Sequence, residues 1–297
     1  MNNRVFIWKD FNEWKPGLEA MFPGILTPEL QAKVRQEATL VRHSDDAEPF
    51  EQLSGHSLDD IITTDKIDKF RRLYSHIRVF HACRTADIQS YRKEGVTLRC
   101  KDDQVKRFRD IFLSGSFPEL SETMLQESIA KLEGSDPDGI LDLGLDDKWI
   151  IEITGHYLIY GSEYLHSLVS QLPIDREKRD QYHAVLRHIG TPTFLLIDLP
   201  NTREYASDGT LWQLIPEMIM NWVYNVAHSR IESGALDFTF TIRKPLPAEH
   251  ICGYLRPPRI PDPHMGWKVY VTETGEYEDR TDRTSTQLAD ERIWPAP

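Results

Sequence analysis

The stretch RVFHACRTADIQSYRKEGV, residues 78–96, is the segment around which the chain is expected to fold. The β-branched and aromatic residues before His81 predict a short buried strand that ends at this histidine. Gly95 predicts the end of a short helix, and Val96 begins a new extended segment. The stretch therefore predicts a strand, a histidine, a tight turn, one short helix and a second strand.

The short helix within this stretch has its own start signals. Thr85 is a good N-cap residue, and Asp87 places a negative charge in the first turn, where the helix dipole favours it. Ile88 and Tyr91 are three residues apart and share one face of the helix. We expect Ser90 and Tyr91 to pack this helix onto the sheet.

A second informative stretch is GHYLIYGSEYLHSL, residues 155–168. Its segment 157–160 suits a strand, Gly161 interrupts it, and Ser162 can cap a helix that begins at Glu163. A strand that passes into a capped helix would present Tyr160 and Glu163 at one edge, where ligands commonly bind. Tyrosines at such positions are also ordinary amphipathic core residues, and that alternative stays open.

Together these two stretches resemble the ADP-ribosyltransferase fold of poly-ADP-ribose polymerases, RNA 2′-phosphotransferases and DarT-type bacterial toxins. The resemblance implies that NAD is the substrate and that His81 hydrogen-bonds the ribose beside the nicotinamide. It implies that Tyr160, or alternatively Tyr157, contacts the nicotinamide. Arg84 would bind the NAD pyrophosphate or be a surface arginine, and Tyr91 is grouped with the NAD-binding residues.

Families of this fold also use a glutamate on a late strand to stabilise the positive charge that develops on the ribose. The expected late strand here, residues 237–242, contains no glutamate. Glu163 is the first choice for this carboxylate, with Asp237 and Glu249 as alternatives. A fold that has lost its transferase activity would explain the departure equally well.

Composition limits the other classes of function. The 297 residues are 40% hydrophobic and 28% charged, which is typical of a globular protein, and no segment predicts a membrane helix. The net charge of −12 argues against broad nucleic-acid binding. Three widely spaced cysteines match neither a disulfide framework nor a zinc site, and the N-terminus lacks signal-peptide features, so we expect a cytoplasmic protein without a metal.

The predicted fold class is α+β, with a split, mostly antiparallel sheet of ADP-ribosyltransferase type and an N-terminal helical cover. The predicted domains are an accessory region at 1–75, a transferase-like domain at 76–272 and an acidic tail at 273–297. Residues 1–25 are expected to form an aromatic arm over another domain or a partner, and 43–64 a loop or an irregular cover.

Three functions remain open from the sequence. The first is an NAD-dependent ADP-ribosyltransferase that modifies a protein or nucleic acid, in the manner of a toxin or phage-defence effector; a toxin would imply an antitoxin partner. The second is an inactive ADP-ribosyltransferase-like binding module. The third is an enzyme similar to RNA 2′-phosphotransferases, which would need several arginines around a phosphate pocket.

Overall fold

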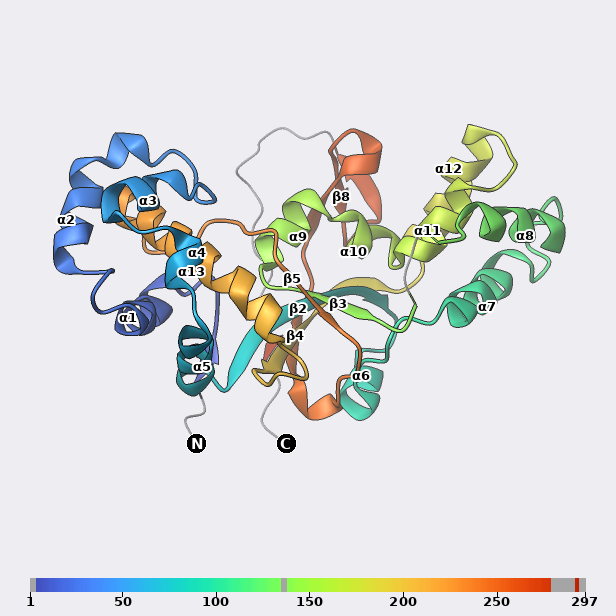
Figure 1. Ribbon diagram of the computed structural model, residues 1–297. Coiled ribbons are helices and arrows are strands. Elements are labelled where there is room, and N and C mark those ends of the chain that lie inside the picture. The colour runs from blue at the N-terminus through green and yellow to red at the C-terminus, as the bar shows by residue number, and fades with distance from the viewer. Residues whose placement is uncertain (1–3, 135–137, 279–291, 294–297) are drawn as a thin grey trace. The chain divides into compact units, whose positions relative to one another are not determined.

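The computed structural model describes residues 4–134, 138–278 and 292–293 (Figure 1). The chain divides into two compact units, one formed by Met1–Val79, Gly144–Asp146 and Asp198–Phe240, the other by Phe80–Leu143, Asp147–Ile197 and Thr241–Pro297. The sequence prediction had assigned 198–240 to the second domain. The predicted tail at 273–297 lies mostly outside the described residues.

The first unit is mainly helical. Its elements are β1 (Val5–Phe6), α1 (Phe11–Met21), α2 (Pro28–Gln36), α3 (Glu48–Ser54), α4 (Leu58–Ile61), α5 (Thr64–Leu73) and α13 (Asp208–His228). The aromatic arm was a wrong prediction, because its middle part forms α1, and Trp14 packs with Phe6, Phe11 and Trp8 in the core. The predicted loop at 43–64 was also wrong, since it contains α3 and α4.

The second unit combines sheet and helix. Its helices are α6 (Ile88–Glu94), α7 (Lys101–Phe112), α8 (Glu122–Lys131), α9 (Asp147–Ile153), α10 (His156–Tyr160), α11 (Glu163–Ser170) and α12 (Arg176–Arg187). Its strands are β3 (Leu141–Gly144), β5 (Thr239–Ile242), β6 (Ile251–Leu255), β7 (Arg259–Asp262), β8 (Lys268–Val271), β9 (Glu276–Glu278) and β10 (Arg292–Ile293). β5 begins within the first unit.

Two long strands, β2 (His76–Thr85) and β4 (Thr191–Pro200), have residues in both units. The larger sheet has the order β10-β6-β4-β2-β3-β5, with β1 parallel to β2, and the smaller sheet has the order β7-β8-β9. The pairs β4–β6, β6–β10, β7–β8 and β8–β9 are antiparallel. The chain therefore belongs to the mixed α+β class.

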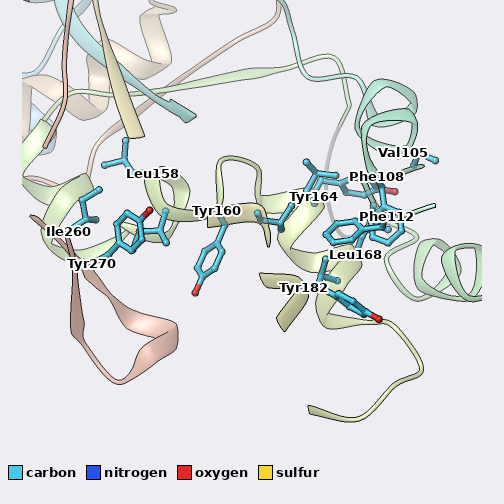
Figure 2. Close-up of a cluster of buried hydrophobic side chains, with 14 of the residues drawn as sticks. Val105, Phe108, Phe112, Leu158, Tyr160, Tyr164, Leu168, Tyr182, Ile260 and Tyr270 are labelled. Carbon is cyan, nitrogen blue, oxygen red and sulfur yellow. The ribbon is translucent and has the colours of Figure 1, made fainter. Parts of the chain in front are cut away.

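The hydrophobic core of the second unit extends from β2 to the helices. Figure 2 shows Tyr160 between two groups of buried side chains: Leu158, Ile260 and Tyr270 on one side, and Tyr164, Leu168 and Phe112 on the other. Phe80 of β2 belongs to this cluster and packs edge-on against Phe194 of β4. None of the described helices is both long enough and apolar enough to span a membrane.

Two details of the first predicted motif differ in the structure. β2 continues through Thr85, so His81 lies in the middle of a strand and does not end it. The N-cap of α6 is Asp87, whose carboxylate accepts a hydrogen bond from the Gln89 amide, while Thr85 accepts one from the Asp87 amide. Gly95 ends α6 with a φ of 79°, as predicted.

Candidate functional site

His81 forms a small polar group with the neighbouring strands. Its Nδ1 lies 3.3 Å from the carbonyl oxygen of Asp142 on β3. The Asp142 carboxylate accepts hydrogen bonds from Arg99 at 3.2 Å and from Thr241 of β5 at 2.7 Å. Burial lowers the pKa of His81, so its imidazole is neutral at pH 7. We call these four residues the His81 group.

Arg84 fills neither of its predicted roles. It is 7% exposed, and its five N–H groups donate to five backbone carbonyl oxygens. These oxygens belong to Leu158, Ile159, Arg187, Ile189 and Gly190. Because a guanidinium has five donors in all, Arg84 has none left for a pyrophosphate. Its role is to hold the end of α10 and the end of α12 against β2.

Tyr91 interacts with the thiol of Cys83. Burial is the main cause that raises the pKa of Tyr91, and the contact with Cys83 adds to it. Burial also raises the pKa of Cys83 to about 11. Both groups are therefore neutral at pH 7. The thiol lies on β2 two residues after His81 and hence on the same face of the strand.

The two predicted halves of the site lie on opposite faces of β2. Side chains alternate along a strand, so Phe80, Ala82 and Arg84 point one way and His81 points the other. Phe80 and Ala82 pack with the core cluster that contains Tyr160, and Arg84 binds the end of α10. The structure therefore brings Tyr160 and Glu163 together but does not bring His81 to them.

The segment 157–160 is helical, so the predicted strand was wrong. Gly155 precedes α10, and a Cβ there would lie 2.6 Å from both the Ile260 side chain and the Pro261 carbonyl oxygen. Gly161 ends α10 with a φ of 84°, and the Ser162 hydroxyl then caps α11 by accepting from the Leu165 amide, as predicted. These two short helices bring their first residues, His156 and Glu163, into contact.

Four histidines from separate elements meet beside this turn. His166 of α11 stacks between His183 of α12 and His264, with ring centroids 4.5 and 4.6 Å apart. His156 of α10 lies edge-on to His264 at 4.9 Å. We call these four residues the histidine cluster. Burial lowers the pKa of His183 and His264, and burial together with the neighbouring histidines lowers that of His166 to about 3.

Glu163 is the carboxylate at the edge of the histidine cluster. Its Oε2 lies 3.2 Å from Nε2 of His156, and the side chain is 41% exposed. Contact with His156 is the main cause that lowers the pKa of Glu163, so the group is ionised at pH 7. Yet Oε2 accepts no well-aligned hydrogen bond. The distance between Nε2 and Oε2 suits a hydrogen bond, but the imidazole of His156 does not point an N–H at the oxygen.

Tyr160 is held from the other side by a buried carboxylate. Its hydroxyl donates to Asp262 at 2.8 Å, and Tyr277 donates to the same oxygen. Burial and Asp262 raise the pKa of Tyr160 to about 12. The Arg187 guanidinium lies over the rings of Tyr277 and Tyr160, at 5.1 and 5.9 Å. Tyr157, in contrast, is 37% exposed and lies against His156.

Buried polar atoms without partners gather in this region. His156 Nδ1, Glu163 Oε2 and Arg187 Nε are each buried without a hydrogen bond among the described residues. Leaving such an atom unpaired costs about 1–3 kcal/mol, and native proteins tolerate few of them. We therefore identify Glu163, Tyr157, Tyr160 and the histidine cluster as the candidate site. The alternative carboxylates, Asp237 and Glu249, are exposed and lie outside it.

Within the described ranges, no three His, Cys, Asp or Glu side chains are arranged to hold an ion. Stacking explains this for the cluster, because stacked rings turn their nitrogens away from a common point. The chain matches no known protein family, no curated protein and no solved structure.

Sequence reasoning missed part of this site. His156 and His166 lie within the stretch 155–168, and His166 follows Glu163 by three residues, a spacing that shares one helix face. His183, Asp262 and His264 come from distant segments, and no local pattern marks them.

Proposed function

We propose that the chain is an NAD-dependent ADP-ribosyltransferase whose reaction centre is Glu163. It would break the bond between nicotinamide and ribose and transfer ADP-ribose to a macromolecular acceptor, releasing nicotinamide and a proton. The observation that carries the proposal is an ionised, half-exposed carboxylate beside His156, at a place where buried polar atoms lack partners.

The chemistry needs such a group. As nicotinamide leaves, positive charge develops on the anomeric carbon, and a fixed carboxylate stabilises it. The backbone of Glu163 is fixed because it is the first residue of α11, whose N-terminus Ser162 caps. The exposed ring of Tyr157 offers a flat surface for an aromatic group such as nicotinamide.

This proposal keeps only some of the residues that the resemblance assigns to the NAD site. Glu163, Tyr157 and Tyr160 stay in one site. Arg84 supports the turn beneath it, and His81 and Tyr91 belong to the other face of β2. A role as a toxin or phage-defence effector, an antitoxin partner and a cytoplasmic location rest on the sequence alone.

The test is release of nicotinamide from NAD by the purified chain. Glu163→Gln removes the charge and should lower turnover about 100- to 1,000-fold with little change in stability. Glu177→Gln is a matched control, because Glu177 is also in the first turn of a helix and is exposed. Equal turnover in the wild type and Glu163→Gln would remove Glu163 from the reaction.

A catalytically inactive binding module is the second candidate. It is favoured by the His81 group, where β5 supplies Thr241 in place of a glutamate and Asp142 is already hydrogen-bonded. This candidate expects NAD to bind without nicotinamide release, and binding to be lost in His81→Ala. The third candidate, an enzyme similar to RNA 2′-phosphotransferases, has less support because it needs several arginines for a phosphate. All donors of Arg84 are already used, and Arg259 pairs with Glu278 at 2.6 Å.

A further inference from the structure

The contact between His156 and Glu163 involves only one of the two carboxylate oxygens. Oε2 is buried and lies 3.2 Å from Nε2 of His156. The Glu163 side chain as a whole is 41% exposed, so its accessible surface lies on atoms other than Oε2. One oxygen thus faces the protein, while part of the same side chain is accessible to a bound molecule.

The backbone around this contact is restrained at both ends. Gly155 places the start of α10 directly against Ile260 and Pro261, where no side chain fits. Gly161 reverses the chain, and a Cβ there would lie 3.1 Å from the side chain of Arg84, which itself binds two carbonyls of α10. The backbone of His156 therefore cannot shift away from α11 without breaking these contacts.

The imidazole of His156 is packed on two sides. The ring of Tyr157 lies 4.2 Å away and that of His264 lies 4.9 Å away. Its Nδ1 is buried without a partner, so the edge that carries Nε2 is the one that meets a polar group. The titratable groups that face the pair are His166, His264 and Tyr157, and Tyr160, Asp262 and Arg187 pack next to these.

We propose that His156 is the positioning residue of Glu163: its Nε2 edge holds the inner carboxylate oxygen, so that the outer oxygen faces the substrate. The contact is poorly aligned in the free protein, as catalytic hydrogen bonds often are before a substrate binds. Substrate binding then aligns the N–H with Oε2. This inference rests on the proposed function, but the contact itself is testable without turnover.

The experiment compares two variants that remove different properties of His156. His156→Phe keeps a ring against Tyr157 and His264 but has no N–H. His156→Gln loses the ring but keeps an N–H that can reach Oε2. His188→Gln is the matched control, because His188 is an exposed histidine of the same unit.

Two measurements are made on each variant. The first is kcat and KM for nicotinamide release, where His156→Phe should lower kcat about 10- to 100-fold and His156→Gln should retain most of it. The second is the pKa of the Glu163 carboxyl, followed by NMR with ¹³C-labelled glutamate. This pKa should rise toward its ordinary value in His156→Phe, so the acid limb of the pH–rate profile moves to higher pH.

Two results would overturn the proposal. If His156→Phe stays folded and leaves the Glu163 pKa unchanged, the imidazole does not hold the carboxylate. If His156→Phe keeps most of its kcat while His156→Gln loses it, only the shape of the ring matters and not its N–H. A wild type that releases no nicotinamide would instead contradict the proposed function, while the NMR comparison still decides whether His156 holds Glu163.

Discussion

On one face of β2, His81 contacts a carbonyl oxygen and the nearby carboxylate of Asp142 is hydrogen-bonded through both oxygens. On the other face, Glu163 and His156 each keep a buried atom without a partner. The first region contains the histidine that the sequence pattern emphasises, yet its polar groups are largely satisfied. The second region retains unused hydrogen-bonding capacity, which is a stronger indication of a ligand than a recognisable pattern.

The largest expected effect is a loss of stability on substitution of Arg84, the residue of β2 that holds the turn beneath the candidate site. Arg84→Met would leave five carbonyl oxygens without their donor, so we expect the free energy of unfolding to fall by about 3–5 kcal/mol. Urea unfolding measures this loss. Arg176→Met is the control, since Arg176 is 89% exposed. A loss of less than about 1 kcal/mol in Arg84→Met would mean that water replaces the guanidinium and that the turn at α10 is not held from β2.

The next largest effect is on nicotinamide release, and it should differ between variants on the two faces of β2. His81→Gln should keep nicotinamide release within about threefold of the wild type, because side chains on opposite faces of a strand do not share a site. Glu163→Gln should lose about 100- to 1,000-fold. Steady-state assays on the two variants make the comparison. Equal, large losses in both would show that the two faces contribute to one reaction, as the resemblance implies.

Local chemistry explains which parts of the fold were predictable. Ser162 was identified as a helix start from its capping side chain, and its hydroxyl accepts the Leu165 amide as expected. The segment 157–160 was misassigned because a short apolar run suits a strand or a helix equally. Distant contacts decide its helical state: Gly155 against β7, and Arg84 against its carbonyls.

The site was less predictable than the fold. Glu163 was chosen from its place after a capped turn, and Tyr160 from the same stretch. Nothing local shows that His183, Asp262 and His264 converge on them, because the helix α12 and the smaller sheet must first pack. The separation of His81 from Glu163 depends on the alternation of side chains along β2. It was missed because the strand had been expected to end at His81.

Because of the histidine cluster, we expect the folded chain to lose stability in mild acid. The pKa of His166 is about 3 in the folded state, whereas an unfolded histidine titrates near 6.5. Between pH 7 and pH 5 the unfolded chain therefore gains a proton that the folded chain does not, and this one residue should cost about 2 kcal/mol of stability. Urea unfolding at the two pH values measures it.

The substitution His166→Gln isolates this contribution. It should flatten the pH dependence, and His183 and His264, whose pKa values are also lowered, should account for much of what remains. His81→Gln provides the comparison from the other face, where a single buried histidine acts in the same direction. A pH dependence in His166→Gln as steep as that of the wild type would mean that the cluster opens and admits protons without unfolding.

The smallest effect concerns two tyrosines, one on each face. Asp262→Asn removes the negative charge next to the Tyr160 hydroxyl, so the pKa of Tyr160 should fall from about 12, while burial still keeps it above its ordinary value. Tyr91, whose pKa is raised by burial and by Cys83 on the His81 face, should not change. NMR of ¹³C-labelled tyrosine, assigned with Tyr160→Phe and Tyr91→Phe, follows both in one titration. A shift at Tyr91 as large as at Tyr160 would show that the charge of Asp262 reaches through β2, and the two faces would then have to be treated as one electrostatic site.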